Sequence, residues 1–118
     1  MPGFPDPFVS NVPGSLMNAE ELTRAIRIDI AGELEAIHLY QAHAQATDNA
    51  LVKEVLLDIA NEERVHTGEL QRLLEILLTD EAGLRSKGAD EVNAAVAKMG
   101  GPAATAAPAE PTTIGALK

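Results

Sequence analysis

A regular apolar pattern in the second half of the chain constrains its fold more than any other feature. Steps of four and three residues from Val52 trace one face of a long helix. Six of the eight positions on this face are apolar, and the two polar ones, Glu63 and His66, are neighbours on it. A buried charge without a partner costs roughly several kcal/mol, so these two side chains need a partner. A cation held between facing helices is the simplest one. The eight positions are Val52, Leu56, Ile59, Glu63, His66, Leu70, Leu73 and Leu77.

The first half of the chain carries a second helix of the same kind. We expect this helix to begin at Asn18, because Glu21 three residues later completes a capping-box pattern. It should end in the polar turn at residues 47–49, where Asp48 would cap the next helix, which runs to about Leu78. Two long helices joined by a short turn form an antiparallel hairpin. The inner positions of the first helix are Ile26, Ile30, Glu33, Ile37, Tyr40 and Ala44.

The chain of 118 residues divides into four predicted segments, and its fold class is all-α. Residues 1–18 are an irregular lead rich in proline and glycine, and residues 19–99 hold the hairpin and a short third helix over 90–99. Residues 100–112 are a flexible Ala/Pro/Thr-rich linker before the last segment, 113–118. Two helices cannot enclose a core by themselves. We therefore predict that two hairpins pair into a four-helix bundle.

Charge and composition exclude several classes of function. The formal net charge is −9 and the nine basic residues are scattered, so we expect no nucleic-acid partner. The absence of cysteine excludes a thiolate zinc site or a rubredoxin-type iron centre and suits a cytoplasmic protein. We see no secretory signal pattern, and no apolar run approaches the roughly 20 residues of a membrane span.

Glu33 adds a third polar side chain at the height of Glu63 and His66. Glu33 and Glu63 each lie about 14 residues from the turn, so in a hairpin of this rise per residue they should stand side by side. Pairing two hairpins doubles the set to four Glu and two His, which is the ligand set of a di-iron carboxylate centre. Such oxygen and imidazole ligands suit ferrous iron and manganese. Taken singly, Glu33 could be a solvated edge residue and His66 a hydrogen-bonded core residue.

Four further polar residues flank these three. Glu35 and His38 repeat the Glu-x-x-His spacing, but Glu35 points away from Glu33, so this pair is expected to be exposed. Glu62 is either a solvated acid or a carboxylate that orients the imidazole or passes cations inward. Tyr40 is either a packed core residue or a hydroxyl donor near the metal.

Two stretches, residues 32–40 (GELEAIHLY) and 61–66 (NEERVH), resemble the encapsulated ferritins. The resemblance covers about residues 20–78 and the extreme C-terminus. It implies a half-ferritin whose ferroxidase site forms across a pair of subunits, with Glu33, Glu63 and His66 as the iron ligands. It also implies a ring of ten chains, a pentamer of dimers, carried as cargo inside an encapsulin nanocompartment where oxidised iron is mineralised.

The last six residues, 113–118 (TIGALK), are similar to the short docking peptide of that family. Ile114 and Leu117 would be the apolar anchors in pockets of the shell, and Gly115 would permit a bend between them. Without the resemblance, a segment of this size would be interpreted as a frayed tail.

The chain departs from the family pattern at two positions. Many relatives carry an acid where this chain has Gly32 and a Trp where it has Leu39, and those positions help to form an outer site that attracts metal. Only Glu35 remains of that set here, although His38 could substitute as a ligand. The sequence therefore leaves the existence of an outer site open.

Three functions compete on these observations. The first is a ferroxidase with a di-iron site shared between two chains. The second is a helical assembly module that binds metal without turnover. The third is a rubrerythrin-like peroxidase, and both the absence of a cysteine-bound iron centre and the single hairpin count against it.

Overall fold

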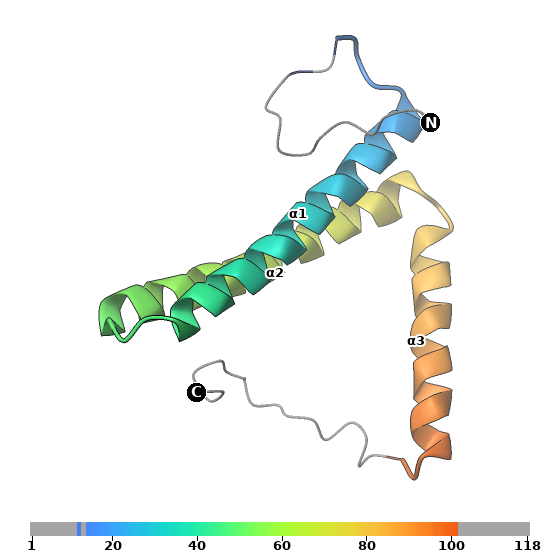
Figure 1. Cartoon of the computed structure of the whole chain (residues 1–118). Helices are drawn as coiled ribbons and strands as arrows, with labels where there is room; N and C mark the ends of the chain where they lie inside the picture. The colour runs from blue at the N-terminus through green and yellow to red at the C-terminus, as the bar shows by residue number, and fades with distance from the viewer. Residues whose placement is uncertain (1–11, 13, 102–118) are drawn as a thin grey trace, which may run out of the picture.

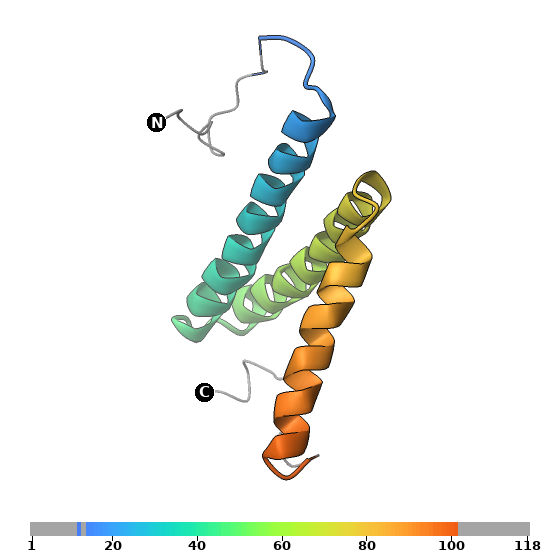
Figure 2. The same cartoon turned by 90° about the vertical axis from the view of Figure 1, so that its right-hand side faces the viewer.

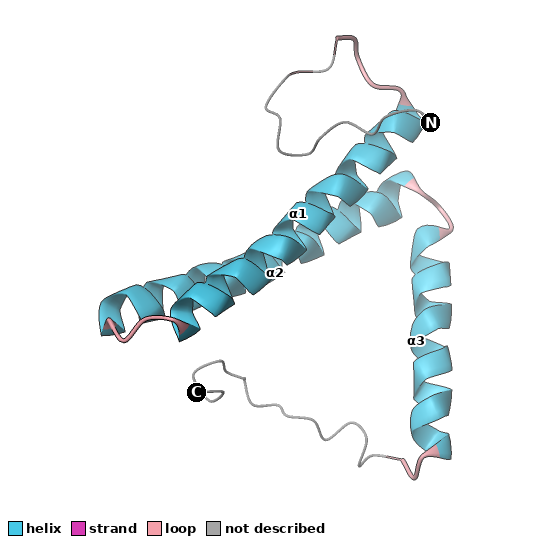
Figure 3. Ribbon diagram, viewed as in Figure 1, coloured by secondary structure: helices cyan, strands magenta, loops and turns pink. Residues whose placement is uncertain are grey.

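A computed structural model describes residue 12 and residues 14–101 of the chain. This part contains three helices and no strand (Figures 1 and 3): α1 (Ala19–Gln45), α2 (Ala50–Leu77) and α3 (Glu81–Lys98). The predicted all-α fold is confirmed. None of these helices is both long and apolar enough to cross a lipid bilayer. The predicted docking peptide, residues 113–118, and nearly all of the linker lie outside the described residues, as does most of the lead.

The start of α1 is the capping box that the sequence predicts. The side chain of Asn18 accepts a hydrogen bond from the backbone N–H of Glu21 at 2.8 Å, and Glu21 Oε1 accepts one from the backbone N–H of Asn18 at 3.0 Å. Two N–H groups that the helix itself cannot satisfy are thereby paired. This local arrangement depends only on residues three apart, so it follows from the sequence.

The cap of α2 differs from the prediction by one residue. Asn49, not Asp48, is the N-cap, and its side chain accepts from the backbone N–H of Val52 at 3.1 Å. The hydroxyl of Thr47 accepts from the backbone N–H of Asn49 at 3.1 Å. This bond holds the turn so that the chain enters the helix one residue later. The turn remains short, and α1 and α2 lie side by side and antiparallel (Figures 1 and 2).

The hairpin buries a narrower strip of α2 than the apolar face that the sequence predicts for this helix. The fully buried apolar residues are Ile26 and Ala44 of α1 and Ala60 and Leu74 of α2. No residue of the predicted face of α2 is fully buried, and Val52 and three others on it are exposed. Two helices touch along a single line, whereas the apolar stripe of such a helix is about 100° wide. The predicted face therefore lies at the open edge of the hairpin, which one chain cannot cover.

The third helix is longer than expected and leaves the hairpin. It begins at Glu81 instead of Asp90, and it contains Gly83 and Gly88, each of which costs a helix about 1 kcal/mol relative to Ala. Beyond the bend after α2, α3 leaves the hairpin at a steep angle (Figure 1). Gly100 and Gly101 follow it with positive φ angles, and the N–H of Gly101 bonds to the carbonyl of Val96.

Candidate metal centre

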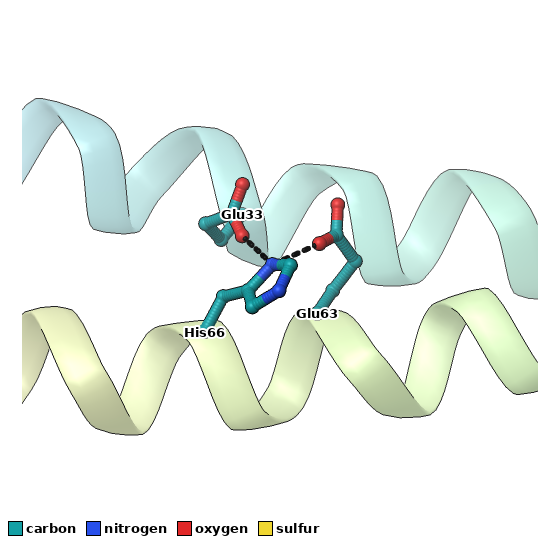
Figure 4. Close-up of side chains that lie close together, drawn as sticks. All are labelled: Glu33, Glu63 and His66. Carbon is teal, nitrogen blue, oxygen red and sulfur yellow. Dashed lines mark hydrogen bonds and ion pairs between the residues drawn. The ribbon is translucent and has the colours of Figure 1, made fainter.

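Three side chains from two helices meet at one point of the hairpin. Glu33 reaches down from α1, and Glu63 and His66 reach up from adjacent turns of α2 (Figure 4). Nδ1 of His66 lies 2.8 Å from Oε2 of Glu33 and 2.6 Å from Oε1 of Glu63. The three ligand atoms all lie within 4.8 Å of one another, which is close enough to share one cation. The structure thus brings together the three residues that the sequence predicts as ligands.

Glu33, Glu63 and His66 together carry a net negative charge, because two carboxylates share one imidazole. An imidazole Nδ1 carries at most one proton, so it can donate to only one of the two carboxylates facing it. Hydrogen bonding of the imidazole to Glu33, and next to Glu63, raises the pKa of His66 above its ordinary value of 6.5. Two carboxylates therefore converge on one nitrogen, and a cation in the place of the proton would be attracted by both.

The group is open on one side. The side chains of Glu33 and Glu63 are 25% and 14% exposed, whereas that of His66 is 50% exposed although both carboxylates touch it. One chain offers three ligand residues, and a di-iron carboxylate centre draws on six from four helices. The open side is the same edge of the hairpin that exposes Leu73 and Leu77. The donor set of two carboxylates and one imidazole suits ferrous iron and manganese.

The other predicted residues lie outside this group. Glu35, His38 and Glu62 are exposed, and Tyr40 is half-buried on α1. Within residue 12 and residues 14–101, the group with metal-ligand spacing includes none of these four. The exposure of Glu35 and His38 agrees with their expected orientation. Their roles, and those of Glu62 and Tyr40, stay predictions.

Glu81 belongs to no motif of the sequence, and it lies at the corner where α3 meets α1. Glu81 pairs with Arg85 one turn later, a spacing that is visible in the sequence. Its other partner, Arg27, is 54 residues away, and no local signal predicts that contact.

The chain matches the family described as "Ubiquinone biosynthesis protein COQ7" over residues 20–108. It is 42% identical over 77 residues to the "Encapsulin nanocompartment cargo protein EncC" of Myxococcus xanthus, a match that covers 65% of this chain and 58% of that protein. It is 44% identical over 55 residues to the "Ferritin-like-encapsulin shell fusion protein" of Pyrococcus furiosus, covering 47% of this chain and 16% of the fusion protein. The matches thus span less than two thirds of either curated relative.

A solved structure gives a broader match. The encapsulated ferritin domain from Pyrococcus furiosus is similar to this chain with a TM-score of 0.66 and 31% sequence identity. The match covers 77% of this chain and 91% of that domain. It includes most of the helical part and nearly the whole of the neighbour. The chain therefore belongs to the ferritin-like family described as COQ7 and, within that fold, to the encapsulated ferritins.

Proposed function

We propose that the protein is a ferroxidase that oxidises Fe²⁺ to Fe³⁺ at a di-iron site formed between two chains. The observation that carries the proposal is the meeting of Glu33, Glu63 and His66 within 4.8 Å at an edge of the hairpin that is left open. Membership in the encapsulated ferritins supports it independently of this geometry.

The need for a second chain follows from the ligand count and from the open edge. A copy related by a two-fold axis would bring a second set of the three residues to the same place, giving four Glu and two His. It would also cover exposed apolar side chains on the same face of α2 as His66, of which Val52, Leu73 and Leu77 are 43%, 47% and 44% exposed. Burying them is favourable by about 25 cal/mol per Å² of apolar surface. Assembly and metal binding would therefore support each other.

In this proposal the side chains of the chain would hold the metal ions and balance their positive charge. Glu33 and Glu63 would hold the two ions through their carboxylates, and His66 would hold one through Nδ1 once its proton has left. Two ferrous ions give up one electron each, and dioxygen or peroxide takes the pair. Tyr40 would donate a hydrogen bond near the site, and Glu62 would orient His66 or pass cations inward. Glu35, with His38, would form an outer cation site.

The cellular setting is proposed from the relatives. One is named an encapsulin nanocompartment cargo protein and another a fusion to an encapsulin shell. We infer that this chain is likewise cargo of an encapsulin shell in the cytoplasm, where it delivers iron for mineralisation and storage. Ile114, Gly115 and Leu117 would dock it to the shell. A ring of ten chains, as the family resemblance implies, would give a mass ten times that of the 12.4 kDa chain in native mass spectrometry.

The test is ferrous oxidation by the full-length protein. Metal-free protein is mixed with Fe²⁺ and oxygen, and the formation of Fe³⁺ is followed by absorbance after the protein-free rate is subtracted. Glu63→Ala should abolish the protein-dependent rate, because it removes a ligand from both halves of the site. Glu54→Ala, the matched control, removes an exposed acid from the same helix and should oxidise iron like the wild type.

The result also separates the proposal from its alternative. A metal-binding assembly module without turnover would bind Fe²⁺ and change its oligomeric state, yet no variant would accelerate oxidation. Equal rates for wild type and Glu63→Ala would contradict the ferroxidase proposal.

A further inference from the structure

Glu81 is the one residue of α3 that is buried, and it lies in the first turn of that helix. Its carboxylate accepts from both terminal nitrogens of Arg27 in α1, at 2.8 Å on Oε1 and 3.3 Å on Oε2. Oε2 also accepts from Nε of Arg85 at 2.9 Å, within α3 itself. The residue as a whole is 7% exposed. Both oxygens of a buried carboxylate are therefore paired, and one partner comes from a different helix.

Few other contacts hold α3 in its direction. Its N-cap residue, Asp80, makes no side-chain hydrogen bond to the helix, unlike Asn18 of α1 and Asn49 of α2. All of its other residues are exposed except Val96, which is half-buried. Figure 1 shows the helix standing away from the hairpin beyond the bend. The direction of α3 thus depends on contacts at its first turn.

The ion pair between Arg27 and Glu81 contributes more to the orientation of α3 than to the stability of the fold. The side chain of Arg27 is 49% exposed, so water screens the attraction and the pair adds little to the stability of the fold. Two parallel hydrogen bonds between a guanidinium and a carboxylate, however, fix the relative geometry of the two groups. Arg27 belongs to the hairpin and Glu81 to the start of α3, so the pair fixes one helix against the other.

We propose that Glu81 is a positioning residue that locks the direction of α3 through Arg27. The direction matters because α3 carries two large exposed apolar side chains, Leu84 (61%) and Val92 (63%), and is followed directly by Met99 (77%). Where α3 points decides where these side chains can meet another surface. The inference concerns geometry within one chain, so it does not depend on iron binding or oxidation.

The test measures the direction of α3 in the full-length protein. The chain has no cysteine, so Asp58→Cys in α2 and Asn93→Cys in α3 provide two exposed sites for spin labels. The distance distribution between the labels is measured by pulsed EPR spectroscopy, with labelled chains diluted in an excess of unlabelled chain to suppress distances between copies. Helix content from circular dichroism checks that each variant is folded.

The two arginines on Glu81 give a matched pair of variants. Arg27→Gln removes the partner on α1 and should broaden or shift the distance distribution. Arg85→Gln removes the same charge from the same carboxylate but acts within α3, so it should leave the distribution close to that of the wild type. Equal distributions for all three proteins, or equal broadening in both variants, would overturn the proposal.

A third variant keeps the test decisive if Arg27→Gln fails to fold. Arg27→Lys retains the charge but cannot form the two parallel hydrogen bonds. It should fold and still broaden the distribution. An unchanged distribution in Arg27→Lys, with Arg27→Gln unfolded, would assign the pair a role in stability alone and would also overturn the proposal.

Discussion

Oε2 of Glu33 lies 2.8 Å from Nδ1 of His66, although the two residues are 33 positions apart and belong to different helices. The contact places an α1 carboxylate against the imidazole that Glu63 already touches from α2. Two carboxylates that share one nitrogen are a poor arrangement for hydrogen bonding and a good one for a cation. The chain thereby presents three side chains that could hold a metal ion at an uncovered edge.

His66 should be required for metal binding, whereas His38 should not. His66→Ala removes the nitrogen at which both carboxylates converge. Even loss of a residue that only supports a ligand weakens metal affinity about 10–100-fold, so we expect a loss of at least about tenfold. His38→Ala is the control, because His38 is an exposed histidine away from the three residues. Titration with Mn²⁺ followed by EPR spectroscopy measures both, and equal affinities would remove His66 from the site.

Removing metal should weaken assembly of the wild type. A ligand at one hundred times its dissociation constant stabilises the state that binds it by about 2.7 kcal/mol. A chelator should therefore shift the protein toward smaller oligomers in native mass spectrometry, and Mn²⁺ should restore the larger ones. Glu33→Gln should show the same oligomers with and without metal. A wild-type distribution that does not respond to metal would separate assembly from the site.

Two neighbouring substitutions distinguish Asn49 from Asp48 as the N-cap residue of α2. Asn49→Ala removes the side chain that accepts from Val52 and should lower the free energy of unfolding by about 1 kcal/mol. Asp48→Ala, one residue earlier, should change it by less than about 0.5 kcal/mol. Urea unfolding measures both. The reverse order of effects would show that the turn caps the helix through Asp48.

The contribution of Glu81 to stability should fall at acid pH. Its hydrogen bonds with Arg27 and then with Arg85 hold its pKa in the folded chain below the ordinary value of 4.5. A lowered folded pKa means that the charged form is favoured by folding, so the contribution is complete above about pH 4.5 and is lost as the pH falls through the folded pKa. The difference in unfolding free energy between wild type and Glu81→Gln should shrink over that range. A difference that grows on acidification would contradict this sign.

The C-terminal segment should act in docking alone. Deleting residues 113–118 should leave iron oxidation unchanged and abolish loading into a co-expressed encapsulin shell, because Ile114 and Leu117 are the proposed anchors. Replacing both anchors with Asp should have the same effect, whereas Thr112→Ala should load normally. Co-purification with the shell measures loading. If the deleted protein still loads, the docking site lies elsewhere in the chain.

Local and periodic features were predictable because they depend on short spacings. The capping box of Asn18 and Glu21 needs only residues three apart, and it is present as predicted. The meeting of Glu33 with Glu63 follows from their equal distance from the turn, since both helices rise by the same amount per residue. The cap at Asn49 was missed because the hydroxyl of Thr47 competes within the same turn, and several polar residues there could cap equally well.

The sequence by itself determined two amphipathic helices, their antiparallel pairing and the three side chains that meet between them. The tertiary structure alone decided which line of the hairpin is buried and where α3 begins and points. Ala60 and Leu74 are buried because they lie where α1 and α2 touch. That line of contact depends on how the two helices pack together and not on either helix alone. Glu81, the first residue of α3, meets Arg27, which lies 54 residues earlier in the sequence. Contacts over that separation leave no period or spacing in the sequence, so only the folded chain reveals them.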